Sequence, residues 1–177
     1  LGYIIINNGK IVDKKDCWIK WNDLKMSAVA AKMTGWTQNK YNRLSLDAKE
    51  VLNDFEKYLY DESYINVGHN ILGFDIYIHG IYRRCLGMKP DYSYVKRSID
   101  TVCIAKALKN DIQFNENNFI SWQYKLNNMM DRKSKKKLID LCKYYEIDFD
   151  ASKLHDAMYD IERNYEVFKK MIWEIEI

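Results

Sequence analysis

Residues 155–160 read His155-Asp156-Ala157-Met158-Tyr159-Asp160, and an earlier stretch reads Gly68-His69-Asn70-Ile71-Leu72-Gly73-Phe74-Asp75. Each stretch places an aspartate near the start of an expected helix, and the later stretch adds a histidine five residues before its aspartate. Two carboxylates and a nearby imidazole are groups that metal-assisted hydrolysis of a phosphodiester uses. The rest of the sequence is therefore examined for a fold that would bring these groups together.

The composition is that of a globular protein. The chain has 177 residues, of which 47% are hydrophobic and 30% charged, and we expect one domain over residues 1–177. Its four cysteines show no Cys-x-x-Cys spacing, which argues against a zinc site and a disulfide framework and favours a reducing compartment. Without an apolar run of membrane-spanning length or an N-terminal leader pattern, we expect a soluble cytoplasmic protein with no membrane partner.

The charge pattern fits nucleic acid without identifying it. The formal net charge is +3 and the sequence pI is about 8.5. One dense basic cluster covers residues 132–137. Such a cluster is either a solvated surface or a set of phosphate contacts, and the sequence leaves both open.

The pattern of apolar residues predicts an α/β fold with a mixed sheet. Residues 1–7 are expected to form a strand, Asn7-Asn8-Gly9 is a hairpin turn signal, and residues 11–12 and 17–21 would continue an antiparallel meander. Further strands are expected at 64–67 and 98–100. Helices are expected at 27–33, 46–60 with Ser45 as N-cap, 74–86, 101–108, 135–145 and from about 156 onward. This order predicts helices on both faces of the sheet.

Two of these helices carry apolar stripes that should mark their buried faces. The helix over 74–86 has its stripe at Ile78, Ile81, Tyr82 and Cys85. The last helix has its stripe at Met158, Ile161, Tyr165, Phe168 and Ile172.

The two aspartates have structural as well as chemical explanations. Asp75 follows a short strand and a turn, so it is expected at the carboxyl end of that strand, where α/β sheets place their sites; it would also interact favourably with the helix dipole. His155 and Asp160 would be about 140° apart in one continuous helix, so His155 is expected in the preceding loop, with Asp156 as the cap. By itself this pattern also fits a surface histidine beside a capping aspartate.

Four ordered stretches together resemble the DEDDh 3′–5′ exonucleases, the family of the DNA polymerase III epsilon subunit, RNase T and oligoribonuclease. His155-x-Ala157-x-x-Asp160 is similar to the third motif of that family, and Gly68-His69-Asn70 leading to Phe74-Asp75 is similar to its second. Met33-Thr34-Gly35-Trp36-Thr37 looks like the His-Gly-Ile-Thr segment, and Ile99-Asp100-Thr101 looks like the Asp-Thr between motifs two and three. The resemblance implies a ribonuclease H-like exonuclease fold.

The resemblance also implies roles for named residues. Asp75 and Asp160 would be ligands of a two-metal site holding Mg²⁺ or Mn²⁺, and His155 would be the general base. Thr34, Gly35 and Trp36 would hold the 3′-terminal nucleotide, while Asn70 would brace its turn or touch substrate. The implied partners are the 3′ end of single-stranded DNA or RNA and, for a proofreading enzyme, a DNA polymerase.

One family motif has no counterpart in this chain. Motif one, an Asp-x-Glu on the first strand, should precede residues 1–7, which fit the family's second strand. The internal Asp54-Phe55-Glu56 lies in the expected helix over 46–60, with Phe55 toward the core, so we do not assign it this role. We expect that motif one and the first strand lie upstream of residue 1, and that residues 1–177 alone are inactive.

Two function classes remain. The first is a metal-dependent 3′–5′ exonuclease that acts on nucleic-acid ends, with single-stranded DNA as the expected substrate. The second is a non-catalytic module of the same fold that binds nucleic acid or a protein. An Asp-x-Glu encoded upstream of Leu1 would favour the enzyme.

Overall fold

A computed structural model of the chain describes residues 1–22, 24–114, 118–130, 137–153 and 156–175. The chain divides into two compact units, one made of Leu1–Lys57 and Asp150–Glu162, the other of Tyr58–Phe149 and Arg163–Ile177. This division does not test whether residues 1–177 form one domain, so that expectation stays a prediction. His155 and residues 132–136 of the basic cluster lie outside the described residues.

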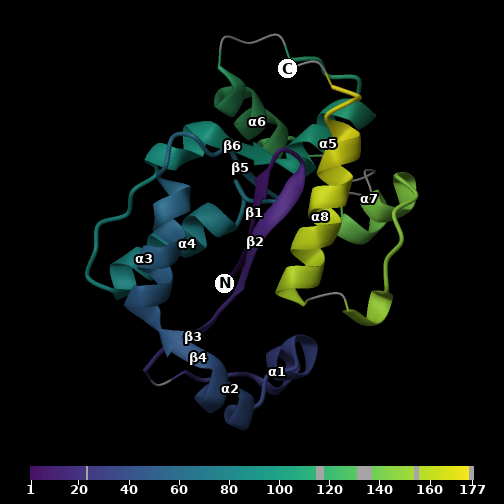
Figure 1. Cartoon of the computed structure of the whole chain (residues 1–177). Helices are drawn as coiled ribbons and strands as arrows, with labels where there is room; N and C mark the ends of the chain where they lie inside the picture. Colours follow the sequence, from purple (N-terminus) through teal and green to yellow (C-terminus); the bar gives the residue numbers. More distant parts are fainter. Residues whose placement is uncertain (23, 115–117, 131–136, 154–155, 176–177) are drawn as a thin grey trace. The chain divides into compact units, whose positions relative to one another are not determined.

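The first unit begins with an antiparallel hairpin of β1 (Gly2–Asn7) and β2 (Lys10–Asp16), drawn in purple in Figure 1. Asn8 and Gly9 have φ angles of 49° and 72°, the left-handed conformations that a tight hairpin turn needs. A bulge shifts the register between Ile5 and Ile6. The hairpin predicted from Asn7-Asn8-Gly9 is therefore confirmed, and β2 runs four residues beyond Val12.

The rest of the first unit corrects the expected meander. β3 (Trp18–Lys20) pairs in parallel with β4 (Ser45–Asp47), so it does not add a third antiparallel strand to the hairpin. The helices α1 (Ala28–Thr34) and α2 (Gln38–Leu44) connect these strands. Ser45 is consequently a strand residue and not the predicted N-cap of α3 (Ala48–Leu59). The Asp47 carboxylate takes the capping role, accepting from the amides of Lys49 at 2.9 Å and Glu50 at 3.0 Å.

Tyr3 ties the hairpin to α3. It is buried, its ring lies 5.2 Å from the ring of Phe55, and its hydroxyl donates to Asp54 Oδ2 at 3.0 Å. Lys57 also donates to Asp54, at 3.1 Å, and these two donors lower the pKa of the Asp54 carboxyl. Asp54 of the internal Asp-x-Glu thus has structural partners within its own unit, in agreement with leaving that pair out of the site.

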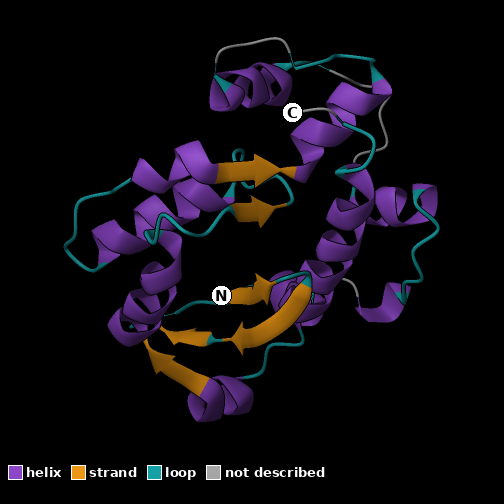
Figure 2. Cartoon of the chain, turned by 45° about the horizontal axis from the view of Figure 1, so that its top comes forward, coloured by secondary structure: helices purple, strands orange, loops and turns teal. Residues whose placement is uncertain are grey.

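The second unit is built around one parallel strand pair. It contains β5 (Asn66–Gly68), α4 (Asp75–Cys85), the 3₁₀ helix η1 (Ser93–Arg97), β6 (Ser98–Asp100), α5 (Thr101–Lys109), α6 (Phe119–Asn128) and α7 (Leu138–Tyr144). Among the described residues the strands form three two-stranded sheets, drawn as orange arrows in Figure 2. The predicted strands at 64–67 and 98–100 correspond to β5 and β6, which pair in parallel.

Two predicted buried stripes are wrong, apart from Tyr82 in the first of them, which is buried. In α4, Ile78 and Ile81 are 46% and 50% exposed, while the buried positions are Ile76, His79, Gly80 and Tyr82. In α8 (Ala157–Met171) the buried positions are Asn164, Val167 and Met171. His79 and Asn164 are buried because each meets a polar partner on another segment, Tyr94 and Thr101 respectively. A search for periodic apolar residues does not predict the burial of polar residues such as these.

The short 3₁₀ helix η2 (Ala151–Lys153) precedes α8, and Asp156 caps α8 as predicted, accepting from the Tyr159 amide at 2.9 Å. The boundary between the two units runs through α3 and α8. None of the helices in the described part of the chain has the length and apolar character of a membrane span.

Tyr41 offers a test of packing in the first unit. Its buried hydroxyl accepts from the Trp21 amide at 2.7 Å and lies 3.1 Å from the Trp21 carbonyl oxygen, to which it donates. We expect Tyr41→Phe to lower the free energy of unfolding by about 1 kcal/mol or more, because two part-buried backbone groups lose their partner. Urea unfolding measures this. Tyr144→Phe, at an exposed tyrosine, is the control, and equal losses in both variants would contradict the assignment.

Candidate active site

The candidate site in the second unit begins where β5 and β6 end. The two strands pair in register from Asn66 opposite Ser98 to Gly68 opposite Asp100. The loop over residues 69–74 then leads from β5 into α4, and α5 follows β6 directly. The carboxyl ends of two adjacent parallel strands therefore meet at one edge, which is where α/β folds carry their sites.

Asp100 fixes the shape of that loop. Its side chain is fully buried and accepts three backbone hydrogen bonds, from Asn70 at 2.9 Å, Leu72 at 3.1 Å and Val102 at 2.9 Å. The last of these caps the start of α5. Burial raises the pKa of the Asp100 carboxyl, while the three amide donors act in the opposite direction. One carboxylate thus joins the β5–α4 loop to the β6–α5 junction.

Neighbouring polar groups extend this arrangement. The Thr101 hydroxyl donates to Asn164 Oδ1 of α8 at 2.8 Å and lies 3.0 Å from His69 Nδ1. On the other side, buried Gln123 of α6 accepts from the Asp100 amide at 2.7 Å and donates to the Ser98 carbonyl at 2.8 Å. The loop is therefore held by groups from α5, α6 and α8 as well as by its own turn.

Asn70 lies in this loop, and Asp75 lies where the loop leads into α4. Asn70 is exposed with a φ of 63°, and it braces the turn through its backbone amide, which donates to Asp100. Asp75 is the first residue of α4 and is solvent-accessible. Partial desolvation of its carboxyl, with a smaller contribution from the negative charge of Asp100, raises the pKa of Asp75 to about 6. An accessible carboxyl with this bias would gain from a nearby cation.

The other predicted site residues belong to the first unit. Asp160 is in the first turn of α8, with its amide bonded to the Asp156 carbonyl at 3.0 Å. Gly35, at a φ of 64°, ends α1, and Thr34 bonds back to the Ala30 carbonyl at 2.9 Å. The half-buried Trp36 ring lies 6.0 Å from the ring of Tyr41. Thr34, Gly35 and Trp36 thus lie together at the end of α1, in the same unit as Asp160.

The structure brings Asp75 and Asn70 together in one unit and Asp160, Thr34, Gly35 and Trp36 together in the other. His155 is outside the described residues. Within the described ranges no group of three or more His, Cys, Asp or Glu side chains is close enough to hold a metal ion. The expected pairing of Asp75 with Asp160 stays a prediction.

Sequence reasoning missed three of the residues that shape this site. Asp100 was noticed only as part of an Asp-Thr pair, and neither Gln123 nor Asn164 was singled out. The one available signal is a polar residue at a helix position that is expected to be buried, such as Gln123 next to the buried Trp122. Apart from Val102, which is two residues after Asp100, their partners lie 23 to 63 residues away in the chain, so a local pattern does not reveal them.

The fold and this site define an α/β domain with carboxylates at the end of a parallel strand pair. The family model described as Exonuclease (RNase_T) matches residues 1–168. The chain therefore belongs to this exonuclease family, whose ribonuclease H-like fold agrees with the mixed α/β architecture and its antiparallel β1–β2 hairpin. A comparison with curated proteins gives no match.

Asp100→Asn tests the role of the buried carboxylate. We expect it to lower the free energy of unfolding by about 1–3 kcal/mol, because an amide group replaces one acceptor oxygen with a donor that faces a backbone N–H. Hydrogen exchange at the Asn70 and Leu72 amides should accelerate more than exchange elsewhere in the unit. Asp111→Asn, at an exposed loop position, is the control. Unchanged exchange at Asn70 and Leu72 would show that Asp100 does not hold the loop.

Proposed function

We propose that this protein is a DEDDh-type, metal-dependent 3′–5′ exonuclease that removes nucleotides from single-stranded DNA ends. Its membership of the exonuclease family supports hydrolysis of nucleic acid. The observation that carries the finer proposal is Asp75: an accessible carboxyl at the start of α4, on a loop fixed by Asp100, with a pKa raised to about 6. A cation beside this carboxyl would offset its desolvation and favour its charged form, which supports the proposed role as a metal ligand.

Asp75 and Asp160 would hold the metal. Both supply carboxylate oxygens, the donor type that Mg²⁺ and Mn²⁺ prefer, so the donor chemistry fits. When bound, the divalent ion supplies charge stabilisation for the phosphoryl oxygens and the leaving oxygen. The remaining ligands of the family's site would come from an Asp-x-Glu motif, a role that we do not assign to Asp54-Phe55-Glu56.

The protein groups would handle the proton and the substrate. His155 would take a proton from the attacking water, a task that suits an imidazole near neutral pH. The water oxygen then bonds to phosphorus as the bond from phosphorus to the 3′ oxygen of the preceding nucleotide breaks. That oxygen leaves and is protonated, which releases a nucleoside 5′-monophosphate. Thr34, Gly35 and Trp36, at the end of α1, would hold the terminal nucleotide.

Cleavage assays test the assignment of these residues. For protein expressed from its whole reading frame with Mn²⁺, we expect release of mononucleotides from a 3′-labelled oligonucleotide. We expect His155→Ala, Asp75→Asn or Asp160→Asn to lower that rate by about a hundredfold or more. Asp54→Asn and Glu56→Gln, which alter the internal Asp-x-Glu, are the matched controls and should retain activity. Cleavage by His155→Ala or Asp160→Asn at the wild-type rate would disprove the assignment.

Metal binding can be measured without cleavage. Because a ligand that binds only the folded state stabilises it, Mn²⁺ should raise the melting temperature of the wild-type protein. The increase should be clearly smaller for Asp75→Asn and Asp160→Asn than for Asp54→Asn. Equal Mn²⁺ responses in all variants would place the ion elsewhere. Binding of DNA with no cleavage under any metal condition would instead support a non-catalytic module of this fold.

A further inference from the structure

A groove in the second unit is lined in part by Ile76 and Tyr77, the two residues that follow Asp75, and we call it the tyrosine groove. It has a volume of about 370 Å³, at the small end of the range for ligand pockets. Ile76 and Tyr77 of α4 form one wall, and Tyr124 of α6 forms another. The third wall is formed by Tyr92, which precedes η1, and by Val95 and Lys96 of η1.

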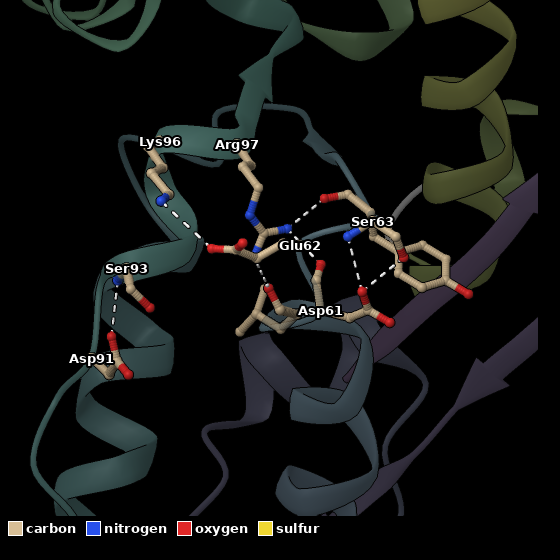
Figure 3. Close-up of polar contacts among 9 residues, drawn as sticks. Asp61, Glu62, Ser63, Asp91, Ser93, Lys96 and Arg97 are labelled. Atoms are coloured by element: carbon tan, nitrogen blue, oxygen red, sulfur yellow. Dashed lines mark hydrogen bonds and ion pairs between the residues drawn. The ribbon is translucent and has the colours of Figure 1, made fainter.

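Arg97 anchors the η1 wall. Its guanidinium group donates to the carbonyl oxygen of Asp61 at 2.7 Å, as Figure 3 shows, and also to those of Tyr64 at 2.5 Å and Leu59 at 3.1 Å. These carbonyls lie at the end of α3 and in the segment before β5, so η1 is joined to both. The groove wall that carries Tyr92, Val95 and Lys96 is therefore held before any ligand arrives.

Two further contacts join η1 to α4. The buried Tyr94 hydroxyl lies 3.1 Å from Nδ1 of buried His79, at hydrogen-bond distance. Gly80 meets Tyr92: a Cβ atom added at Gly80 would lie 2.4 Å from the Tyr92 hydroxyl oxygen. Tyr92 thus lies directly against the α4 backbone, in a position that any larger residue at 80 would block. The groove is a pre-formed feature of this unit.

The tyrosine rings that line the groove are at least partly accessible to solvent. Tyr77 and Tyr92 are 53% and 42% exposed, and Tyr124 is half-buried. Burial first, and then the neighbouring phenols of Tyr77 and Tyr92, raise the pKa of Tyr124. Lys96 adds a positive charge at the rim, where it meets Glu62 at 3.7 Å with both side chains largely in solvent (Figure 3). An exposed pair of this kind is weak, so a phosphate could replace Glu62.

We propose that the tyrosine groove binds a base of the single-stranded nucleic acid on the 5′ side of the nucleotide being removed, with Lys96 at the adjoining phosphate. This inference rests on the proposed function. Aromatic rings stack on bases of any sequence, and phenol hydroxyls both donate and accept toward base edges. Ile76 and Tyr77 directly follow Asp75 in the first turn of α4, so the groove that they line begins within about one helical turn of that carboxyl along the helix axis, on a different face of the helix.

Binding without metal tests the groove separately from cleavage. In EDTA, we measure the fluorescence anisotropy of a 5′-labelled dT octanucleotide and of a labelled dT mononucleotide with the full-length protein. We expect Tyr77→Ala and Tyr124→Leu to weaken octanucleotide binding about five- to fiftyfold, in line with the loss of one stacked base, and to leave mononucleotide binding unchanged. Tyr124→Phe, which keeps the ring, should restore most of the affinity. Tyr144→Leu, at an exposed tyrosine outside the groove, is the control.

Two more variants examine the groove wall and the phosphate contact. Gly80→Ala leaves all three tyrosines in the sequence but displaces Tyr92, and the variant, once shown to be folded by circular dichroism, should bind the octanucleotide more weakly. Lys96→Gln should reduce the salt dependence of binding by about 0.7 in the slope of log K against log salt, the value for one single-strand phosphate. An unchanged slope would remove Lys96 from the contact.

The outcomes separate the two proposals. If folded Tyr77→Ala and Tyr124→Leu bind the octanucleotide with wild-type affinity, the groove proposal is wrong, even if the protein cleaves DNA. If binding depends on the groove but the protein never cleaves, the groove proposal stands and the exonuclease proposal is wrong. Aromatic grooves also bind proline-rich peptides. If these variants lose affinity for a proline-rich peptide and keep it for DNA, the nucleic-acid proposal is wrong.

Discussion

The carboxylate of Asp100 is the interaction on which the arrangement of the second unit depends. It accepts from three backbone amides, two in the loop before α4 and one at the start of α5. A buried carboxylate is costly unless such donors surround it, so the loop and the helix start must keep their geometry for the chain to fold. The direction in which α4 leaves β5, and with it the position of Asp75, follows from this constraint.

Asp75 and Asp100 show how one fold gives two carboxylates different tasks. Asp100 is fully buried and its oxygens are occupied by backbone donors, so it is a positioning residue. Asp75 is accessible, and it experiences both partial desolvation and the charge of Asp100. Partial desolvation and the charge of Asp100 thus make ionisation of the Asp75 carboxyl less favourable than ionisation of a free aspartate. A cation would relieve that cost, which is why we assign the metal to Asp75 and not to Asp100.

The sequence predicts the parts of this fold that depend on neighbouring residues. The Asn7-Asn8-Gly9 hairpin and the Asp156 cap both follow from local backbone preferences. The buried faces of α4 and α8 do not, because His79, Gly80 and Asn164 are buried by contacts with Tyr94, Tyr92 and Thr101. Periodicity ranks residues by hydrophobicity, so it selected Ile78 and Ile81, which the fold leaves exposed. Periodicity also does not predict the partner strand of β3, because the parallel pairing with β4 joins segments more than twenty residues apart.

The face of α4 that is buried, which differs from the predicted one, accounts for the tyrosine groove. Because His79 and Gly80 turn inward to meet Tyr94 and Tyr92, Tyr77 is directed outward on the same helix that begins with Asp75. Asp100 fixes the start of that helix and the His79–Tyr94 contact fixes its middle, so the spacing between the carboxyl and the ring is set by rigid secondary structure. A strand bound by the ring would therefore meet the carboxyl at a defined offset, and an enzyme that removes one nucleotide at a time needs such an offset.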